Sequence, residues 1–171
     1  MIKGFYVEDE IENITSLKRL FKLEDIDLSY KEELLDSPEG YYDLFFEQDI
    51  NFVIIDKNLD KKGMGYTGLD VLKEIRKQDS NIYIVLLTSY VDEVANEDLV
   101  DFDQVIDKGF LDDQLDVLIT RIKRSYNRCK SKQIVEEIEV TLQQKKDESE
   151  QHINELKKIN ENIEQLLRDK K

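Results

Sequence analysis

Short runs of apolar and β-branched residues alternate, over the first two thirds of the chain, with stretches whose apolar residues have helical spacing. The runs predict strands at Ile2–Val7, Ile26–Tyr30, Phe52–Ile55, Ile82–Leu87 and, more weakly, Gln104–Ile106. The stretches between them predict helices with apolar faces at Ile11, Ile14, Leu17 and Phe21; at Tyr41, Leu44 and Phe45, where Pro38 suits a first turn; at Leu69, Leu72 and Ile75 after Gly68; and, as a poorer set, at Val91, Val94 and Leu99. Because strands that alternate with helices pair in parallel through right-handed crossovers, we expect an α/β fold with a doubly wound five-stranded parallel sheet.

The last third of the chain has a different pattern. Residues 110–171 contain no glycine or proline and are dominated by Glu, Lys, Gln, Leu, Ile and Arg, which predicts one long helix. Its first apolar residues suit a helix packed on the sheet; they are Leu115, Leu118, Ile119 and Ile122. We therefore expect a sheet domain at 1–124 and a helical extension at 125–171.

The extension carries a heptad pattern with a polar middle. The a and d positions of one frame are Val135, Ile138 and Leu142, then the polar Lys145, Ser149 and His152, then Leu156, Ile159, Ile163 and Leu166. A continuous helix from Asp113 would be nearly 90 Å long at about 1.5 Å per residue, which is too long to stay single in water. We expect a parallel homodimeric coiled coil; a hairpin near Lys145–Glu150 is the alternative, although that segment lacks a turn residue.

Charge separates the same two parts of the chain. The 171 residues carry 25 Lys plus Arg and 39 Asp plus Glu, a formal charge of -14. Residues 1–112 hold 27 acidic and 12 basic side chains, and residues 113–171 hold 12 and 13. This balance disfavours a sequence-independent grip on nucleic acid or anionic lipid. A basic cluster could still touch nucleic acid or a membrane, but a solvated helix face is the preferred interpretation; its members are Arg121, Lys123, Arg124, Arg128, Lys130 and Lys132.

The composition also bears on location. The single cysteine, Cys129, cannot form an intrachain disulfide, and no apolar run is long enough to cross a membrane. Ile2–Val7 is too short for a secretory signal and is followed directly by Glu8, Asp9 and Glu10. We therefore expect a cytoplasmic protein without a membrane partner.

Polar side chains follow the predicted strands at their carboxyl ends, where doubly wound sheets form their functional crevice. Glu8, Asp9 and Glu10 end the first strand, and Asp56, Thr88 and Lys108 end the third, fourth and fifth. Clustered carboxylates repel one another unless a cation neutralises them, and carboxylates with open water positions suit Mg²⁺. Lys108 and Thr88 could hold phosphoryl oxygens. The set predicts a phosphoryl-transfer site in which a carboxylate is the nucleophile.

These residues resemble one family, the receiver domains of two-component response regulators. The matching segments are Val7-Glu8-Asp9-Glu10, Val53-Ile54-Ile55-Asp56, the run Met64-x-x-x-Gly68-Leu69-x-Val71-Leu72, Leu86-Leu87-Thr88 and Ile106-Asp107-Lys108. They have the family's order and roughly its spacing over about 110 residues. The resemblance implies a flavodoxin-like receiver fold and a signalling role without an enzymatic activity of its own.

The resemblance also implies roles for individual residues. Asp56 would accept phosphate from a phosphohistidine of a histidine kinase or phosphotransfer protein. Asp9, Asp56 and the backbone carbonyl of Asn58 would bind Mg²⁺, and Glu8 would act through a metal-bound water. Thr88 and Lys108 would hold the phosphoryl oxygens.

Some positions depart from the family pattern. The usual Lys-Pro, whose peptide bond is typically cis, is Lys108-Gly109 here, so either this bond is trans or the site is strained. Val105 replaces the usual switch aromatic, and the segment from Thr88 to Lys108 lacks the usual Gly-Ala pair. These changes affect the family's threonine-to-aromatic switching and leave the residues of phosphoryl chemistry in place.

Other interpretations of these motifs compete with a phosphorylated receiver. A phosphorylation-independent scaffold built on a pseudo-receiver is the main alternative, and an aspartate-nucleophile phosphatase is disfavoured because Asn58 stands where its acid would be. The GxGxxG run at 63–68 is separated from its strand by charged residues, so a flexible loop is favoured over a dinucleotide site. His152 lacks the flanking residues of a kinase histidine and suits a helix surface or seam.

No turn residue divides the segment after residue 112 into separate helices, as a helix-turn-helix would require. We therefore expect output through a downstream protein effector and no sequence-specific DNA binding. The identity of the kinase, the pathway and the effector are left open by the sequence, as is whether the chain is part of a longer protein.

Overall fold

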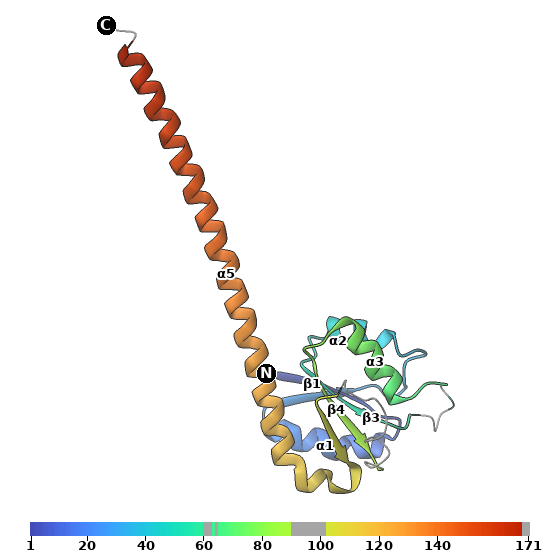
Figure 1. Ribbon diagram of the computed structural model, residues 1–171. Helices are drawn as coiled ribbons and strands as arrows, with labels where there is room; N and C mark the ends of the chain where they lie inside the picture. The colour runs from blue at the N-terminus through green and yellow to red at the C-terminus, as the bar shows by residue number, and fades with distance from the viewer. Residues whose placement is uncertain (60–62, 64, 90–101, 169–171) are drawn as a thin grey trace. The chain divides into compact units, whose positions relative to one another are not determined.

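One sheet of five parallel strands forms the centre of the N-terminal part of the protein. The structure, a computed structural model, describes residues 1–59, 63, 65–89 and 102–168 (Figure 1). The strand order is β2-β1-β3-β4-β5, and every neighbouring pair is parallel. The strands are β1 (Ile2–Val7), β2 (Ile26–Tyr30), β3 (Phe52–Asp56), β4 (Tyr83–Thr88) and β5 (Gln104–Asp107). The predicted fold class is confirmed, and the strand bounds differ from the prediction by one residue at most.

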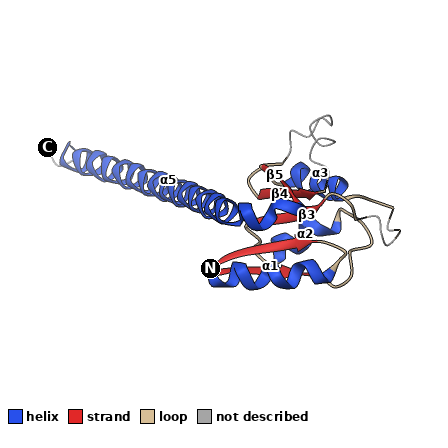
Figure 2. Ribbon diagram, turned by 90° about the horizontal axis from the view of Figure 1, so that it is seen from below, coloured by secondary structure: helices blue, strands red, loops and turns tan. Residues whose placement is uncertain are grey.

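Helices connect the first four strands along the chain, and a long helix follows the last strand (Figure 2). They are α1 (Ile11–Leu23), α2 (Gly40–Glu47), α3 (Gly68–Gln78) and, after a short 3-10 helix at Lys108–Phe110, α5 (Leu111–Arg168). Because α2 begins at Gly40, Pro38 precedes its first turn, and the Pro38 carbonyl accepts the backbone N–H of Tyr41 at 3.3 Å. The helix predicted around Val91, Val94 and Leu99 lies outside the described residues.

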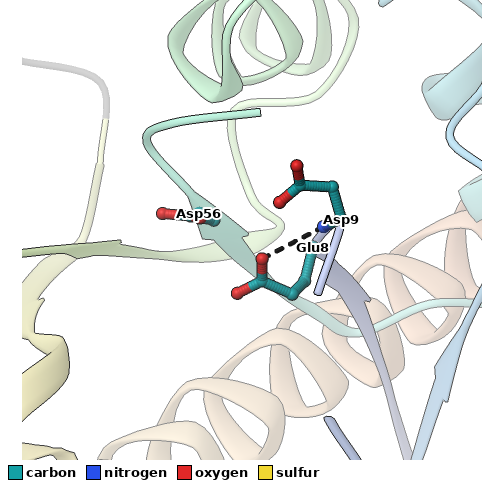
Figure 3. Close-up of side chains that lie close together, drawn as sticks. All are labelled: Glu8, Asp9 and Asp56. Carbon is teal, nitrogen blue, oxygen red and sulfur yellow. Dashed lines mark hydrogen bonds between the residues drawn. The ribbon is translucent and has the colours of Figure 1, made fainter. Parts of the chain in front are cut away.

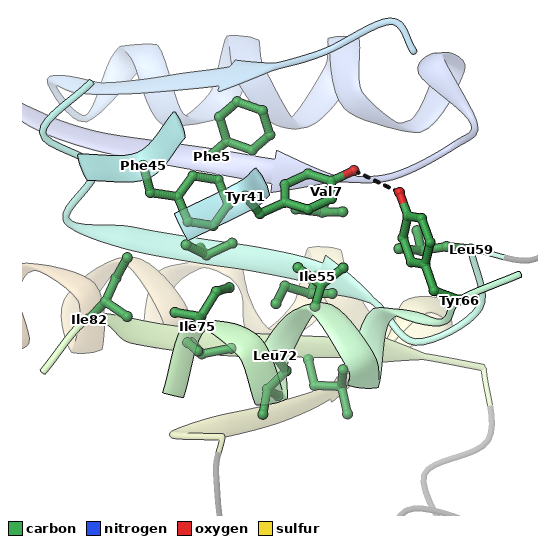
Figure 4. Packing of buried hydrophobic residues seen from close by; sticks show 14 residues of the cluster. Phe5, Val7, Tyr41, Phe45, Ile55, Leu59, Tyr66, Leu72, Ile75 and Ile82 are labelled. Atoms are coloured by element: carbon green, nitrogen blue, oxygen red, sulfur yellow. Dashed lines mark hydrogen bonds between the residues drawn. The ribbon is translucent and has the colours of Figure 1, made fainter. Parts of the chain in front are cut away.

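Both faces of the sheet are covered, since successive side chains of each strand point to opposite faces. On one face, Phe5 and Ile55 pack in a cluster with residues of α2 and α3 (Figure 4). On the other face, Tyr6 and Ile54 pack with residues of α1 and with Leu118 of α5. All five residues of β3 are buried, as expected for a central strand with helices on both sides.

A glycine and an aromatic ring face each other across two of the central strands. Gly4 of β1 is the register partner of Phe52 of β3. A Cβ atom added at Gly4 would lie 2.1 Å from the Cζ atom of Phe52, so no larger residue fits while the ring stays in place. The Phe52 ring stacks on Phe21 of α1, with 5.7 Å between ring centroids. The missing side chain at Gly4 therefore makes the space into which this aromatic pair packs.

The chain divides into two compact units, Met1–Asn127 and Arg128–Lys171. In the first unit, α5 contributes Leu118, Ile119 and Ile122 to the core. The second unit is the rest of α5, whose side chains are all exposed from 130 to 162. α5 continues through 145–150 without a break, so the hairpin alternative is wrong. None of the helices among the described residues is long and apolar enough to span a membrane.

Candidate functional site

The predicted site residues lie at one edge of the sheet because all five strands run in the same direction. Glu8 and Asp9 directly follow β1, and Asp56 is the last residue of β3. Thr88 is the last residue of β4, and Lys108 directly follows β5. The sequence thus placed each of these residues at the correct strand end.

Three carboxylates converge at this edge (Figure 3). One carboxylate oxygen from each of Glu8, Asp9 and Asp56 lies within 4.8 Å of the other two. The exposed fractions of these residues are only 2%, 8% and 4%, so their charges are largely removed from water. Negative charges so close together in a buried place require compensation by cations or hydrogen-bond donors.

Lys108 supplies part of that compensation. Its Nζ atom lies 2.7 Å from Oδ2 of Asp56 and 2.9 Å from Oε2 of Glu8. The Lys108 side chain is 25% exposed, so the ammonium group lies at the boundary between the buried carboxylates and solvent. Three carboxylates and one ammonium leave a formal charge of about -2 at this edge.

The carboxyl groups of Asp56 and Glu8 respond differently to this environment. Burial raises the pKa of Asp56 to about 6, and the nearby charge of Glu8 adds to the rise, while the hydrogen bond from Lys108 opposes it. Burial also favours a higher pKa for Glu8, but hydrogen bonds from Lys108 and the backbone outweigh it and hold the pKa of Glu8 below its ordinary value. Burial alone would lower the pKa of Lys108, yet its bonds to Asp56 and Glu8 raise it. Glu8 and Lys108 therefore stay charged, and Asp56 is the more easily protonated carboxylate.

Backbone groups hold the carboxylates in place. Oε1 of Glu8 accepts the backbone N–H groups of Asp9 at 3.0 Å and of Glu10 at 3.1 Å. Oδ1 of Asp56 accepts the backbone N–H of Asn58 at 3.3 Å. Asn58 itself is exposed in the loop after β3, two residues after Asp56 along the chain. Its backbone thus reaches the site through Asp56.

Gly68 allows α3 to start directly against the backbone of Asp56. A Cβ atom at Gly68 would lie 1.9 Å from the Asp56 carbonyl oxygen, a distance that no side chain could occupy. The Gly68 N–H donates to the Lys57 carbonyl at 3.0 Å, and a capping box between Thr67 and Asp70 fixes the first turn of α3. The start of α3 therefore braces the strand end that carries Asp56.

Thr88 is fully buried at the same edge. It is the register partner of Asp107 on β5, and the preceding residue, Leu87, pairs with Asp56 on β3. Its place follows from the sheet register, one residue beyond the pair that contains Asp56.

Two of the departures from the family pattern, Lys108-Gly109 and Val105, lie in or directly after β5. No peptide bond among the described residues is cis, so the bond between Lys108 and Gly109 is trans. The Asp107 side chain accepts the Gly109 N–H at 2.8 Å and caps the 3-10 helix that follows. Val105 is partly buried against the cluster on the α3 side of the sheet. Of the two alternatives for the Lys108–Gly109 bond, the trans form is the one found.

Sequence reasoning missed Tyr6, the next-to-last residue of β1. Its hydroxyl donates to Oε2 of Glu8 at 3.0 Å, and its side chain is buried. The signal that could have found it is the spacing of two, which places Tyr6 and Glu8 on the same face of an extended chain. An apolar residue would satisfy the strand pattern equally well, so the hydroxyl was easily overlooked.

The donor set fits a hard divalent cation. All its groups are oxygens, three of them come from separate carboxylates, and their net negative charge exceeds what Lys108 can balance. Mg²⁺ prefers such ligands and keeps several waters of its own. Chemically, the arrangement can hold a cation and a phosphoryl group beside an aspartate carboxylate.

Comparisons with known proteins agree with this geometry. The family model of the response regulator receiver domain matches residues 5–120. A receiver domain structure from Clostridium thermocellum is 21% identical, with a TM-score of 0.59, over 76% of this chain and 98% of that chain. The response regulator protein TrrA from Thermotoga maritima, in complex with Mg(2+)-BeF, is 26% identical, with a TM-score of 0.59, over 71% and 99%.

A further structure shows TrrA with a second protein. In the complex of histidine kinase ThkA with TrrA, the matching chain is 27% identical, with a TM-score of 0.57, over 71% of this chain and 98% of that chain. The search of curated proteins finds no match.

Proposed function

Because the chain belongs to the response regulator receiver domain family, we propose that Asp56 accepts a phosphoryl group from a histidine kinase or phosphotransfer protein. Two similar structures support the proposal, since one is a complex with Mg(2+)-BeF and the other is a complex with a histidine kinase. The observation that carries it is the contact of the Lys108 ammonium with both Asp56 and Glu8 at the sheet edge.

Asp56 is suited to be the nucleophile. In the transfer, an oxygen of its carboxylate attacks the phosphorus of a phosphohistidine, the new P–O bond forms as the P–N bond breaks, and the imidazole nitrogen leaves with the electron pair of that bond. With a pKa of about 6, Asp56 is mostly ionised at neutral pH and more basic than an ordinary aspartate. Burial thus raises its basicity without removing its charge.

Lys108 and Thr88 are placed to receive the transferred group. The Lys108 ammonium already contacts the Asp56 oxygen, so a small movement would bring it to an oxygen of the phosphoryl group. The Thr88 hydroxyl, at the end of β4, would donate to another. Both groups would offset the negative charge of the phosphoryl oxygens beside the Asp56 carboxylate.

The carboxylates of Asp9 and Asp56, with the backbone carbonyl of Asn58, would hold Mg²⁺, and Glu8 would act through a metal-bound water. When bound, the cation would supply positive charge that stabilises the phosphoryl oxygens in the transition state. The role of this chain's residues is to keep the carboxylates gathered before the cation binds.

The test is the formation of an acyl phosphate. Incubation with acetyl phosphate and Mg²⁺ should add about 80 Da, one phosphoryl group, to the intact mass. Asp56→Ala should abolish the adduct, and Asp27→Ala, which removes an exposed aspartate of β2, should leave it unchanged. An adduct that persists in Asp56→Ala would contradict the assignment of Asp56. No adduct in the wild-type protein would favour the phosphorylation-independent scaffold.

We assign residues 1–124 to the receiver domain and 125–171 to a helical extension that pairs two chains in a parallel coiled coil. Several apolar side chains in this extension are more than half exposed, and they include Val135, Ile138, Leu142, Leu156 and Ile159. Pairing of two copies would bury those that fall on the heptad seam. Signalling would then pass through this dimer to a downstream protein effector in the cytoplasm.

Sequence-specific DNA binding is not part of the proposal. Residues 130–162 form a single helix with every side chain exposed, which differs from the compact helix-turn-helix module of many sequence readers. Any DNA binding through basic residues such as Arg121 and Lys123 should be independent of sequence and should fall steeply as salt rises. Fluorescence anisotropy with random and genomic duplexes at two salt concentrations tests this; tight, sequence-selective binding at physiological salt would refute it.

A further inference from the structure

The hydroxyl group of Tyr6 contacts the acidic site from inside the core. Tyr6 is 2% exposed and packs among residues of α1 and α5, on the face of the sheet opposite α2 and α3. Its hydroxyl donates to Oε2 of Glu8 at 3.0 Å. No step of the proposed phosphoryl transfer uses Tyr6, so this contact needs an explanation of its own.

The Glu8 carboxylate accepts four hydrogen bonds. Two reach Oε1 from the backbone N–H groups of Asp9 and Glu10, and two reach Oε2 from the Tyr6 hydroxyl and the Lys108 ammonium. An ionised carboxylate has about four acceptor positions, so Glu8 is saturated. Its orientation is fixed from three directions: the backbone, the core and the solvent edge.

These donors differ in their ability to move. Lys108 also contacts Asp56, at 2.7 Å, and any cation or phosphoryl group that binds there competes for the same oxygens. The Tyr6 ring is enclosed by the core, where it packs with residues of α1 and α5, so its hydroxyl keeps its position. Tyr6 therefore stays a proton donor to Glu8 when Lys108 changes partner.

We propose that Tyr6 is a positioning residue of this site: its hydroxyl holds the Glu8 carboxylate beside Asp9 and Asp56 while Lys108 exchanges one partner for another. The proposal rests on the proposed function, because it assigns Tyr6 to the binding of the same cation. Without the hydroxyl, Oε2 of Glu8 would keep only Lys108 as a donor. An entering cation would then have to displace a more tightly held ammonium and to orient a freer carboxylate.

The expected effect is a weaker affinity for Mg²⁺ alone. A hydrogen bond to a charged group contributes enough to change a binding constant about tenfold, so Tyr6→Phe should raise the Kd for Mg²⁺ by about that factor. The matched control is Tyr83→Phe. Tyr83 is also a strand tyrosine whose hydroxyl donates to one side chain, Gln104, at 3.1 Å. The Tyr83→Phe protein should bind Mg²⁺ with the wild-type Kd.

A double-mutant cycle separates positioning from a general loss of structure. Titration calorimetry on the full chain would compare Tyr6→Phe, Glu8→Gln and the double variant. If Tyr6 acts through Glu8, Tyr6→Phe weakens Mg²⁺ binding in the wild-type background and adds little in the Glu8→Gln background. A wild-type Kd in Tyr6→Phe, or an equal loss in both backgrounds, would overturn the proposal.

A spectroscopic measurement without metal keeps the inference separate from the proposed function. The ultraviolet difference spectrum between wild type and Glu8→Gln should contain a tyrosine band, because the Tyr6 hydroxyl loses an anionic acceptor, and the band should vanish when both proteins carry Tyr6→Phe. Its absence would overturn the contact itself. The two measurements can disagree. If the difference spectrum contains the band but the wild-type protein forms no Asp56 adduct, the Tyr6–Glu8 contact is supported and the proposed phosphorylation is not.

Discussion

The carboxyl group of Asp56 is harder to ionise in the folded chain than in the unfolded chain. Burial raises its pKa to about 6, whereas an aspartate in an unfolded chain has a pKa of about 3.9. Between these values the folded state binds more protons than the unfolded state, so this residue destabilises the fold as pH rises. The cost is complete above about pH 6 and disappears as pH falls towards 4.

We therefore predict a pH-dependent gain in stability when Asp56 is replaced by a neutral isostere. In the absence of divalent metal, Asp56→Asn should be more stable than the wild type by on the order of 1–2 kcal/mol at pH 8. The gap should narrow below about pH 6 as the wild-type carboxyl takes up its proton. Urea unfolding at a series of pH values measures it, with Asp27→Asn as an exposed control. A gap that is constant with pH would contradict the raised pKa.

Single residues of the site differ in how well the sequence predicts them. Glu8, Asp56, Thr88 and Lys108 follow recognisable strands, and parallel pairing brings strand ends together without knowledge of any side-chain contact. Tyr6 could not be found in this way, because its role depends on where a hydroxyl at the end of a buried ring meets a carboxylate. The hydrophobic pattern of a strand indicates which residues are buried. It does not indicate where a polar atom at the end of a buried side chain, such as the Tyr6 hydroxyl, will lie.

At the scale of secondary-structure elements, Arg76 connects α3 by hydrogen bonds to the residues just before β4 and β5, at the end of the sheet away from the acidic site. Nη1 of Arg76 donates to the Ile82 carbonyl at 2.7 Å, and Nη2 lies 2.6 Å from Oδ2 of Asp103. The same Asp103 oxygen accepts the backbone N–H of Ile84 at 2.8 Å. Arg76 therefore links the end of α3, the start of β4 and the residue before β5.

Replacing Arg76 should destabilise the protein without touching the phosphoryl chemistry. The Arg76 side chain is only 13% exposed, so Arg76→Ala would remove a mostly buried guanidinium and leave the Ile82 carbonyl without this donor, at a cost of about 1–3 kcal/mol. Chemical denaturation monitored by circular dichroism would measure the loss.

The neighbouring lysine provides the control for this prediction. Lys77 pairs with Glu74 on the same helix, but its side chain is 64% exposed, so Lys77→Ala should cost less than about 1 kcal/mol. Equal losses in the two variants would show that the Arg76 bonds contribute nothing beyond a surface ion pair. Mg²⁺ affinity should match the wild type in both, because Arg76 lies where the strands begin and the acidic site lies where they end.

The central strands were largely predictable because both faces of β3 and of β4 are buried. Val53–Ile55 and Ile84–Leu87 are continuous apolar runs, and the structure buries all of these residues. The start of α2 was less predictable, since proline suits both a first helical turn and the turn before it. Here the Pro38 carbonyl accepts the Tyr41 N–H in a turn that precedes the helix.

At the scale of the whole molecule, two exposed apolar side chains of the extension provide a test of pairing. Leu142 is 61% exposed and lies on the heptad seam, whereas Val140 is 58% exposed and lies off it. These two residues are therefore matched in exposure and differ in their heptad position. A second copy of the chain would bury the first and leave the second in solvent.

We predict that Leu142→Lys dissociates the dimer and that Val140→Lys does not. Each buried leucine contributes roughly 1.5–3 kcal/mol, so the loss of two per dimer should weaken association by at least about 100-fold. Light scattering over a range of concentrations measures the oligomeric state.

Truncation gives an independent check of the dimer. The full chain should be a dimer and a chain ending at Arg124 a monomer, because the seam residues all lie after that position. The same state for both chains, or equal effects of the two lysine variants, would count against a paired extension. A higher-order oligomer of the full chain would exclude the two-stranded form.

The packing of Phe52 against Gly4 makes the evolution of these two positions interdependent. Because a Cβ atom at position 4 would overlap the aromatic ring at position 52, Gly4 cannot change while the ring stays in place. A larger residue at position 4 becomes acceptable only after the ring at 52 has become smaller, and a smaller residue at 52 leaves a cavity that a side chain at 4 can fill. The two positions should therefore covary among relatives. A larger residue at 4 together with a smaller residue at 52 would identify this pairing of β1 and β3 in a distant sequence, even where the acidic residues have been lost.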